Sequence, residues 1–176
     1  MEIERKFLIK ELPYTSSELQ HFPHDVITQG YLCTSPVLRI RQKNQDYIFT
    51  YKSAGLMTRE EIEAPLTKES FKQLLTKCDG SIIQKTRYKI PESQTGKSDK
   101  QLTIELDLFH GELEGLMQAE VEIRSEEEAV KYQAPEWFYL EVTHSNTFHN
   151  STISHSPAEE ILVKAKELLQ TTHDNP

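Results

Sequence analysis

The chain has 176 residues, long enough for one domain with a substantial core, and a formal net charge of −8. The acidic balance argues against a nucleic-acid binder that works through bulk positive charge. No apolar run is long enough to span a membrane, and we expect no N-terminal signal peptide, because no charged-then-apolar segment precedes the first predicted strand. The two cysteines form no disulfide framework and no metal motif. We therefore expect a single cytoplasmic domain over residues 1–176, without nucleic-acid or membrane partners.

Polar and apolar side chains alternate along most of the chain, which is the period of a β-strand. The first stretch, residues 1–9, places Glu2, Glu4 and Lys6 on one face and apolar side chains on the other. The same pattern predicts further strands over residues 27–32, 37–43, 47–53, 58–66, 82–90, 102–109, 119–125 and 139–143. The sequence thus indicates about eight strands, each with one apolar and one charged face.

Helices are few and amphipathic. Residues 67–78 place apolar side chains at helical spacing behind Thr67, which is a suitable N-cap. A second helix is predicted from Ser156 to about Gln170, and a short one after Ser125, where a glutamate at the third following position completes a capping box. Each of these helices needs an apolar surface to cover.

The charges are segregated by strand, and two architectures explain this pattern. Outward-facing charges would belong to a sandwich or a filled barrel with a wetted exterior. Inward-facing charges would line the lumen of a closed eight-stranded barrel whose apolar exterior is covered by helices. In a lumen, carboxylates would attract hard divalent cations and the basic side chains would attract phosphate. Alternation alone leaves both architectures open.

A set of short motifs resembles the CYTH family, also called the triphosphate tunnel metalloenzymes. The N-terminal Glu2-Ile3-Glu4-Arg5-Lys6 is similar to the family's ExExK signature. Further matches follow in family order: Gln29-Gly30-Tyr31-Leu32, Leu38-Arg39-Ile40-Arg41, Thr50-Tyr51-Lys52, Glu61-Ile62-Glu63, Lys85-Thr86-Arg87, Glu105-Leu106-Asp107, Ala119-Glu120-Val121-Glu122 and Glu141-Val142-Thr143. The resemblance implies a mainly β, α+β fold: a closed eight-stranded antiparallel tunnel with a charged lumen and helices packed outside.

The resemblance also implies which residues form the active site. The metal ligands would be the carboxylates of Glu2, Glu4, Glu61, Glu63, Glu120 and Glu122, holding Mg²⁺ or Mn²⁺. The substrate phosphates would bind to Lys6, Arg39, Arg41, Lys52, Lys85 and Arg87. The catalytic group would comprise Glu2, Glu4, Lys6, Lys52 and Lys85. Glu105, Asp107 and Glu141 are additional inward carboxylates that would orient the arginines, and Tyr31 and Tyr51 are expected to pack.

The implied activity is metal-dependent hydrolysis of a triphosphate, first of all inorganic triphosphate, to pyrophosphate and phosphate. A nucleoside triphosphatase, a thiamine triphosphatase and an adenylyl cyclase of the same fold are alternatives. A non-catalytic binder of polyphosphate or nucleotide is an alternative of another class. Relatives of this kind often form dimers, so the resemblance also allows a homodimer.

The chain departs from the family pattern after its last strand. Many relatives carry a basic residue in an Asp-rich segment there, whereas this chain has Thr147 at the corresponding place. Either one phosphate contact is missing, or His149 supplies it.

Overall fold

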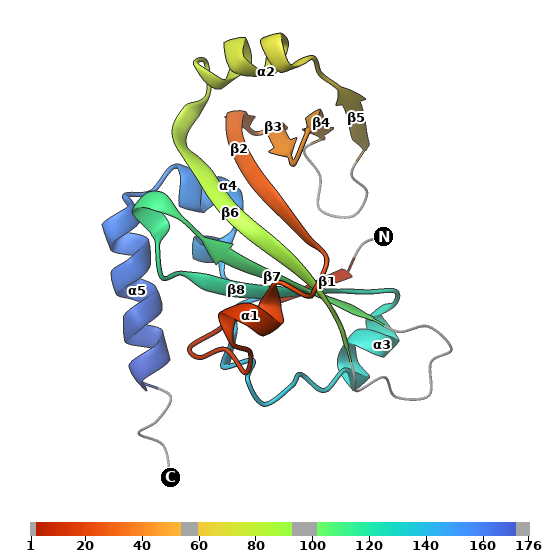
Figure 1. Ribbon diagram of the computed structural model, residues 1–176, viewed down its shortest axis with the longest axis vertical. Coiled ribbons are helices and arrows are strands. Elements are labelled where there is room, and N and C mark those ends of the chain that lie inside the picture. Colours follow the sequence, from red (N-terminus) through yellow and green to blue (C-terminus); the bar gives the residue numbers. More distant parts are fainter. Residues whose placement is uncertain (1–2, 54–59, 93–101, 172–176) are drawn as a thin grey trace.

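The protein, described here from a computed structural model that covers residues 3–53, 60–92 and 102–171, is built on one antiparallel sheet (Figure 1). The strands are β1 (Ile3–Leu8), β2 (His24–Thr34), β3 (Val37–Lys43), β4 (Asp46–Lys52), β5 (Glu61–Pro65), β6 (Asp79–Pro91), β7 (Thr103–Phe109), β8 (Met117–Ile123) and β9 (Leu140–Glu141). The α-helices are α1 (Ser16–Leu19), α2 (Lys68–Leu75), α3 (Glu126–Lys131), α4 (Asn150–Ser154) and α5 (Ala158–Thr171). Two 3₁₀ turns cover Gly111–Leu113 and Asn146–Phe148.

The sheet is open rather than closed. Its nine strands follow the order β5-β4-β3-β2-β6-β7-β8-β1-β9, and among the described residues no ladder joins β5 to β9. The prediction of mainly β structure with antiparallel pairing is confirmed, but the prediction of a closed eight-stranded barrel is wrong. Side-chain alternation fixes the face that each residue occupies; it does not determine whether the two edge strands pair.

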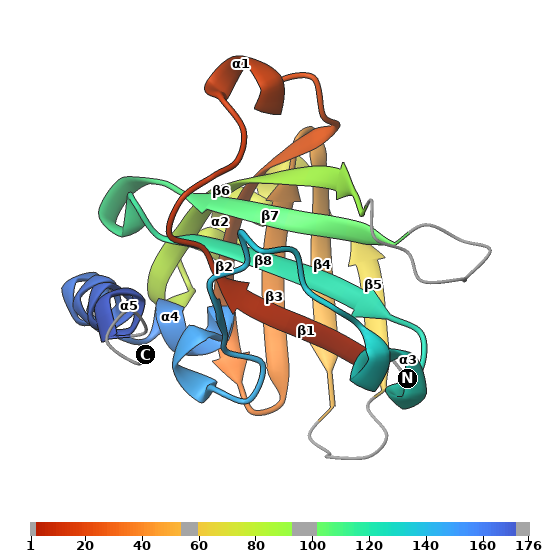
Figure 2. The same ribbon diagram turned by 90° about the horizontal axis from the view of Figure 1, so that it is seen from below.

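The sheet folds over into two arms that share the long strands β2 and β6. In Figure 1, one arm carries β3, β4 and β5 below α2, and the other carries β7, β8 and β1. Figure 2 shows that the strands of one arm cross those of the other, so the two inner faces oppose each other. The charged side chains predicted to share a face therefore meet in the space between the arms.

The outer face of the arm formed by β1, β7 and β8 carries one apolar cluster, centred on Phe7, Leu106 and Val121, as the alternation predicts. A second cluster joins Leu8 and Phe109, which lie on the same faces as Lys6 and Asp107, to helix α5. The helix caps agree with the sequence, because Thr67 accepts from the amide of Ser70 and Ser125 from the amide of Glu128. Of the helices described, none combines the length and hydropathy that crossing a membrane requires.

Candidate active site

A cavity of about 360 Å³ lies between the two arms. Eleven charged side chains line it: Glu4, Lys6, Arg39, Arg41, Lys52, Glu61, Glu63, Arg87, Glu105, Glu120 and Glu122. The remaining lining residues are Tyr31, Val37, His149, Asn150 and Ser151. Five cationic and six acidic side chains thus face one space, which makes it suited to a highly charged ligand with its counter-cation.

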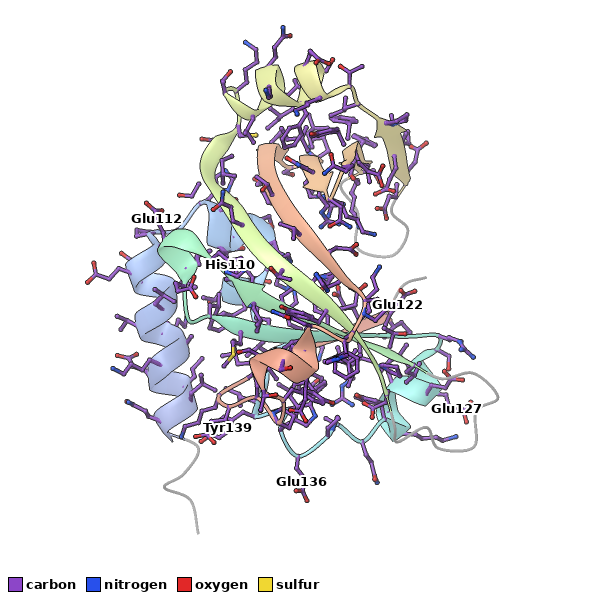
Figure 3. All side chains as sticks on the ribbon, viewed as in Figure 1. His110, Glu112, Glu122, Glu127, Glu136 and Tyr139 are labelled. Carbon is purple, nitrogen blue, oxygen red and sulfur yellow. The ribbon has the colours of Figure 1, made fainter. Side chains whose placement is uncertain are left out.

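Two glutamates from neighbouring strands form the acidic side of the cavity. Strand β1 pairs with β8 so that Lys6 lies opposite Glu120 and Glu4 opposite Glu122. Burial, the negative charge of Glu120 and a hydrogen bond to Glu120 raise the pKa of Glu4 to about 8. The Glu4 carboxyl therefore keeps its proton at neutral pH and shares it with Glu120. Figure 3 shows Glu122 beside the start of β1, on the side of the fold away from α5.

The Glu120 carboxylate contacts two cationic side chains of the same arm, Lys6 and Arg87. Its Oε1 lies 2.8 Å from the Lys6 ammonium, and its Oε2 accepts from Arg87 Nη2 at 2.7 Å. Although burial opposes ionisation, Arg87, Lys6 and Lys85 hold the pKa of Glu120 well below its usual range. Glu120 is thus a fixed carboxylate in the cavity wall.

Behind the cavity wall formed by Lys6, Arg87 and Glu120, Lys85 and Asp107 form a fully buried ion pair. Lys85 Nζ donates to Asp107 Oδ2 at 2.6 Å, and neither side chain is exposed. Asp107 also accepts two hydrogen bonds from Arg87, each 2.7 Å long, while Glu105 pairs with the outer Nη1 of Arg87. Burial lowers the pKa of Lys85 to about 8 despite the charge of Asp107. Lys85, predicted to bind substrate, therefore supports the wall from below and is not among the lining residues.

The opposite arm presents its cations from β3 and β4. Arg39 Nη2 donates to the Thr50 hydroxyl at 3.0 Å, and Thr50 donates in turn to Glu63 at 3.1 Å. Lys52 Nζ lies 3.1 Å from a carboxylate oxygen of Glu61 on β5. Glu63 also lies 3.7 Å from Arg39 Nη2, so both glutamates predicted as metal ligands on β5 contact cations of their own arm.

A single buried amide connects Arg41 to Tyr31. Gln29 Oε1 accepts from Arg41 Nε at 3.0 Å, and Gln29 Nε2 donates to the Tyr31 hydroxyl at 3.2 Å. Burial, together with the charges of Arg39 and Arg87, lowers the pKa of Arg41 to about 10. The expectation that Tyr31 only packs is incomplete, because its side chain lines the cavity.

The segment around α4 forms the end of the cavity nearest α5. His149, Asn150 and Ser151 line it, and Asn150 Oδ1 accepts from Lys85 Nζ at 3.4 Å. Thr147, which replaces the expected basic residue, instead accepts from Lys164 of α5 at 3.0 Å. His149, which the sequence offered as a replacement for that phosphate contact, lies in the cavity wall.

The structure brings most of the predicted site residues to one cavity. Ten of them line it: Glu4, Lys6, Arg39, Arg41, Lys52, Glu61, Glu63, Arg87, Glu120 and Glu122. Lys85 lies beneath the wall, and Glu2 lies outside the described residues. Glu141 faces away and binds Arg5 on the outer side of β1.

Besides Tyr31 and Val37, the residues that sequence reasoning did not place in the wall are Asn150 and Ser151. They follow a segment whose polar composition carries no strand or helix period, so only its position after the last strand could have indicated them. Gln29 was found only as part of a motif. Its spacing of two from Tyr31 placed both side chains on one face, but gave no hint of their hydrogen bond.

The chain is similar to a known protein family. A family model for the CYTH domain matches residues 1–156. The chain is 38% identical over 158 residues to an inorganic triphosphatase of Nitrosomonas europaea, covering 87% of this chain and 96% of that protein. It is 32% identical over 161 residues to an inorganic triphosphatase of Acetivibrio thermocellus, covering 89% of this chain and 94% of that protein.

A solved structure leads to the same family. The crystal structure of an inorganic triphosphatase superposes with a TM-score of 0.65 at 34% sequence identity, over 89% of this chain and 95% of that one. The match to the family model covers most of the chain and includes every strand described above. The chain therefore belongs to the CYTH family.

Proposed function

We propose that the protein hydrolyses inorganic triphosphate to pyrophosphate and phosphate. The observation that carries this proposal is the cavity between the arms, in which Lys6, Arg39, Arg41, Lys52 and Arg87 face one another. Inorganic triphosphate is negatively charged along its whole length, and the five cationic side chains of the cavity wall are complementary to that charge. The relatives from Nitrosomonas europaea and Acetivibrio thermocellus are both named inorganic triphosphatases, which supports the same substrate.

The composition of the wall favours an inorganic substrate over a nucleotide or thiamine ester. An adenine or thiazolium ring needs an apolar or aromatic face, and apart from the His149 imidazole the described wall offers only Tyr31 and Val37. Tyr31 already uses its hydroxyl in a hydrogen bond to Gln29. ATP, thiamine triphosphate and the cyclase reaction therefore remain alternatives that the test below must separate.

In the proposed reaction, water attacks the terminal phosphorus, the anhydride P–O bond breaks, and pyrophosphate leaves with the bonding electron pair. The barrier falls when negative charge on the transferred group and on the leaving oxygen is stabilised. Arginine side chains do this through paired N–H donors, and Lys6 and Lys52 add point charges. Because Glu120 and Asp107 hold Lys6 and Arg87 in place before substrate arrives, little reorganisation is needed.

We propose that the reaction needs Mg²⁺ or Mn²⁺, held by Glu4, Glu120 and Glu122. Within residues 3–53, 60–92 and 102–171, no three acidic, imidazole or thiol groups converge closely enough to hold a metal ion. The donor chemistry nevertheless fits, because Glu4, Glu120 and Glu122 all line the cavity and carboxylate oxygens are the ligands that a hard cation prefers. Glu2, the remaining predicted ligand of this arm, lies outside the described residues. When bound, the cation would neutralise phosphate oxygens and help to orient water.

The test is release of phosphate and pyrophosphate from inorganic triphosphate, ATP and thiamine triphosphate, each with Mg²⁺, Mn²⁺ or EDTA. The proposal expects the highest kcat/KM for inorganic triphosphate, with activity lost in EDTA. It expects at least a hundredfold loss in Glu4→Gln, the scale on which a mispositioned catalytic group costs rate. Preference for ATP with formation of cyclic AMP would favour a cyclase, and tight binding without turnover would favour a binder.

Other expectations remain predictions from the sequence. They are a single domain over residues 1–176, a cytoplasmic location, a homodimer, and the absence of nucleic-acid and membrane partners. Glu61 and Glu63 remain proposed as further cation ligands, and Lys85 as a substrate-binding residue.

A further inference from the structure

Gln29 is a fully buried polar side chain, with no exposed surface, between two residues that line the cavity. Its amide contacts the Arg41 guanidinium at one end and the Tyr31 hydroxyl at the other. We propose that Gln29 is a positioning residue that directs the terminal amino groups of Arg41 and the hydroxyl hydrogen of Tyr31 into the cavity, toward triphosphate oxygens. The inference deepens the proposed function and rests on it.

The orientation of the amide follows from donor and acceptor chemistry. Arg41 has only N–H donors, so the atom of Gln29 that faces Arg41 Nε at 3.0 Å must be the carbonyl oxygen. The amino group of Gln29 then faces the Tyr31 hydroxyl at 3.2 Å, and it has no lone pair to accept with. Hence Tyr31 accepts from Gln29, and its own hydrogen must point to another partner.

The hydroxyl hydrogen of Tyr31 can reach a hydrogen-bond acceptor in the cavity. Tyr31 lines the cavity, and in the part of the chain that the structure describes its hydroxyl makes no other hydrogen bond. A phosphate oxygen is an acceptor without hydrogens, so it is complementary to this donor. The result is an O–H group aimed before substrate arrives, which a freely rotating hydroxyl would not provide.

The same bond selects which edge of Arg41 meets the substrate. Nε is occupied by Gln29, and among the described residues neither terminal amino group of Arg41 has a hydrogen bond. The guanidinium therefore offers its end-on pair of donors, which matches two oxygens of one phosphate. Arg39 is held differently, since one of its terminal amino groups already donates to Thr50.

The backbone that carries Gln29 and Tyr31 has little freedom to shift. Gly30 lies between them on the opposite face, where an added Cβ would come within 2.6 Å of Cys78 Sγ and 2.8 Å of Ile82 Cδ1. The register of β2 shifts on both sides of Tyr31, after Gln29 in the pairing with β6 and before Cys33 in the pairing with β3. Close packing behind the strand restricts the direction of both side chains.

The decisive variants change one end of the amide at a time. Gln29→Glu keeps the acceptor for Arg41 but replaces the amino donor by an oxygen, so the Tyr31 hydroxyl turns to donate to it. Gln29→Met removes both bonds at similar volume. Tyr31→Phe removes only the hydroxyl. Tyr132→Phe, which deletes a hydrogen bond to Glu92 that is 2.9 Å long and outside the cavity, is the matched control.

We expect a double-mutant cycle in which the losses of kcat/KM from the two substitutions are not additive. Gln29→Glu and Tyr31→Phe each lower kcat/KM for inorganic triphosphate by about tenfold or more, because each removes a hydrogen bond to a charged group. Combining them costs no more than Gln29→Glu alone, because the hydroxyl is already turned away. Gln29→Met loses more than Gln29→Glu, and Tyr132→Phe leaves kcat/KM unchanged.

Binding of inorganic triphosphate, measured by calorimetry in EDTA on the same variants, separates the two proposals. If the wild type binds but releases no phosphate, the proposed function fails and the same cycle in Kd still tests Gln29. Wild-type kcat/KM and Kd in Gln29→Glu would overturn the inference, and so would fully additive losses in the double variant. A wild type that neither binds nor hydrolyses triphosphate would overturn both proposals.

Discussion

The Lys85 ammonium nitrogen lies 2.6 Å from Oδ2 of Asp107, and neither side chain has any exposed surface. Asp107 is also the shared acceptor for Arg87, so one carboxylate compensates two buried cations. Removing one partner of a buried pair leaves an uncompensated charge, which costs about 3–5 kcal/mol. We therefore predict that Asp107→Asn lowers the free energy of unfolding, measured in urea, by about 3 kcal/mol.

The matched control is Glu105→Gln, which removes a different carboxylate from the same arginine. The Glu105 side chain is 36% exposed, and an exposed ion pair contributes about 1 kcal/mol or less. Equal losses in the two variants would show that burial of Lys85 and Asp107 does not set the strength of this network.

Metal binding should release a proton from the pair of glutamates on β1 and β8. Burial and the charge of Glu120 raise the pKa of Glu4 to about 8, so Glu4 is mostly protonated at neutral pH. A cation must displace that proton, so affinity should rise up to about tenfold per pH unit and level off above about pH 8. Calorimetry with Mg²⁺ in buffers of different ionisation enthalpy measures the proton. A pH-independent Kd with no proton release would contradict this prediction.

Arg5 connects the outer side of β1 to β9 and to the C-terminal end of helix α3. Its guanidinium binds both carboxylate oxygens of Glu141 and donates to the carbonyl oxygens of Ala129 and Tyr132 at 3.1 and 3.0 Å. The hydrogen bond from Arg5 holds the pKa of Glu141 below its usual range. The pair therefore stabilises the fold above the unfolded pKa of about 4.3, and this contribution disappears as the pH falls through the lower folded pKa.

We therefore predict that the difference in free energy of unfolding between wild type and Glu141→Gln depends on pH. Since the Glu141 side chain is 38% exposed, the difference at neutral pH should be about 1 kcal/mol or less. It should shrink toward zero in acid, as measured by urea unfolding across the pH range. A difference that grows on acidification would contradict the assigned ion pair.

Gly80 permits the close contact between β6 and α4. It has a φ of +74°, and an added Cβ would overlap the carbonyl oxygen of Ser154. Gly115 also has a positive φ, +94°, but an added Cβ there meets nothing within 4 Å. Gly115→Ala should lower the free energy of unfolding by about 1–2 kcal/mol through backbone strain alone. Gly80→Ala should lower it by clearly more, because the added Cβ also overlaps a carbonyl oxygen. Thermal unfolding of both variants gives the comparison, and equal shifts in Tm would contradict it.

Sequence periodicity predicted the strands because their alternation is driven by burial of one face. It also grouped Arg39 with Arg41 and Glu4 with Lys6 correctly, since residues two apart share a face. It could not show that the sheet stays open, because the pairing of edge strands depends on the curvature of the whole sheet. It could not separate Lys85 from Arg87 either: they share a face, but only their depth decides that Arg87 lines the cavity while Lys85 is buried below it.

Hydrolysis by this protein is tested best by ³¹P NMR of inorganic triphosphate in the presence of the wild-type protein and Mg²⁺. We predict that the triphosphate signals are replaced by equal amounts of phosphate and pyrophosphate. We also predict that this conversion stops when EDTA is added and is lost in Glu4→Gln. Unchanged triphosphate with Mg²⁺ and with Mn²⁺, or conversion at the same rate in Glu4→Gln, would contradict it.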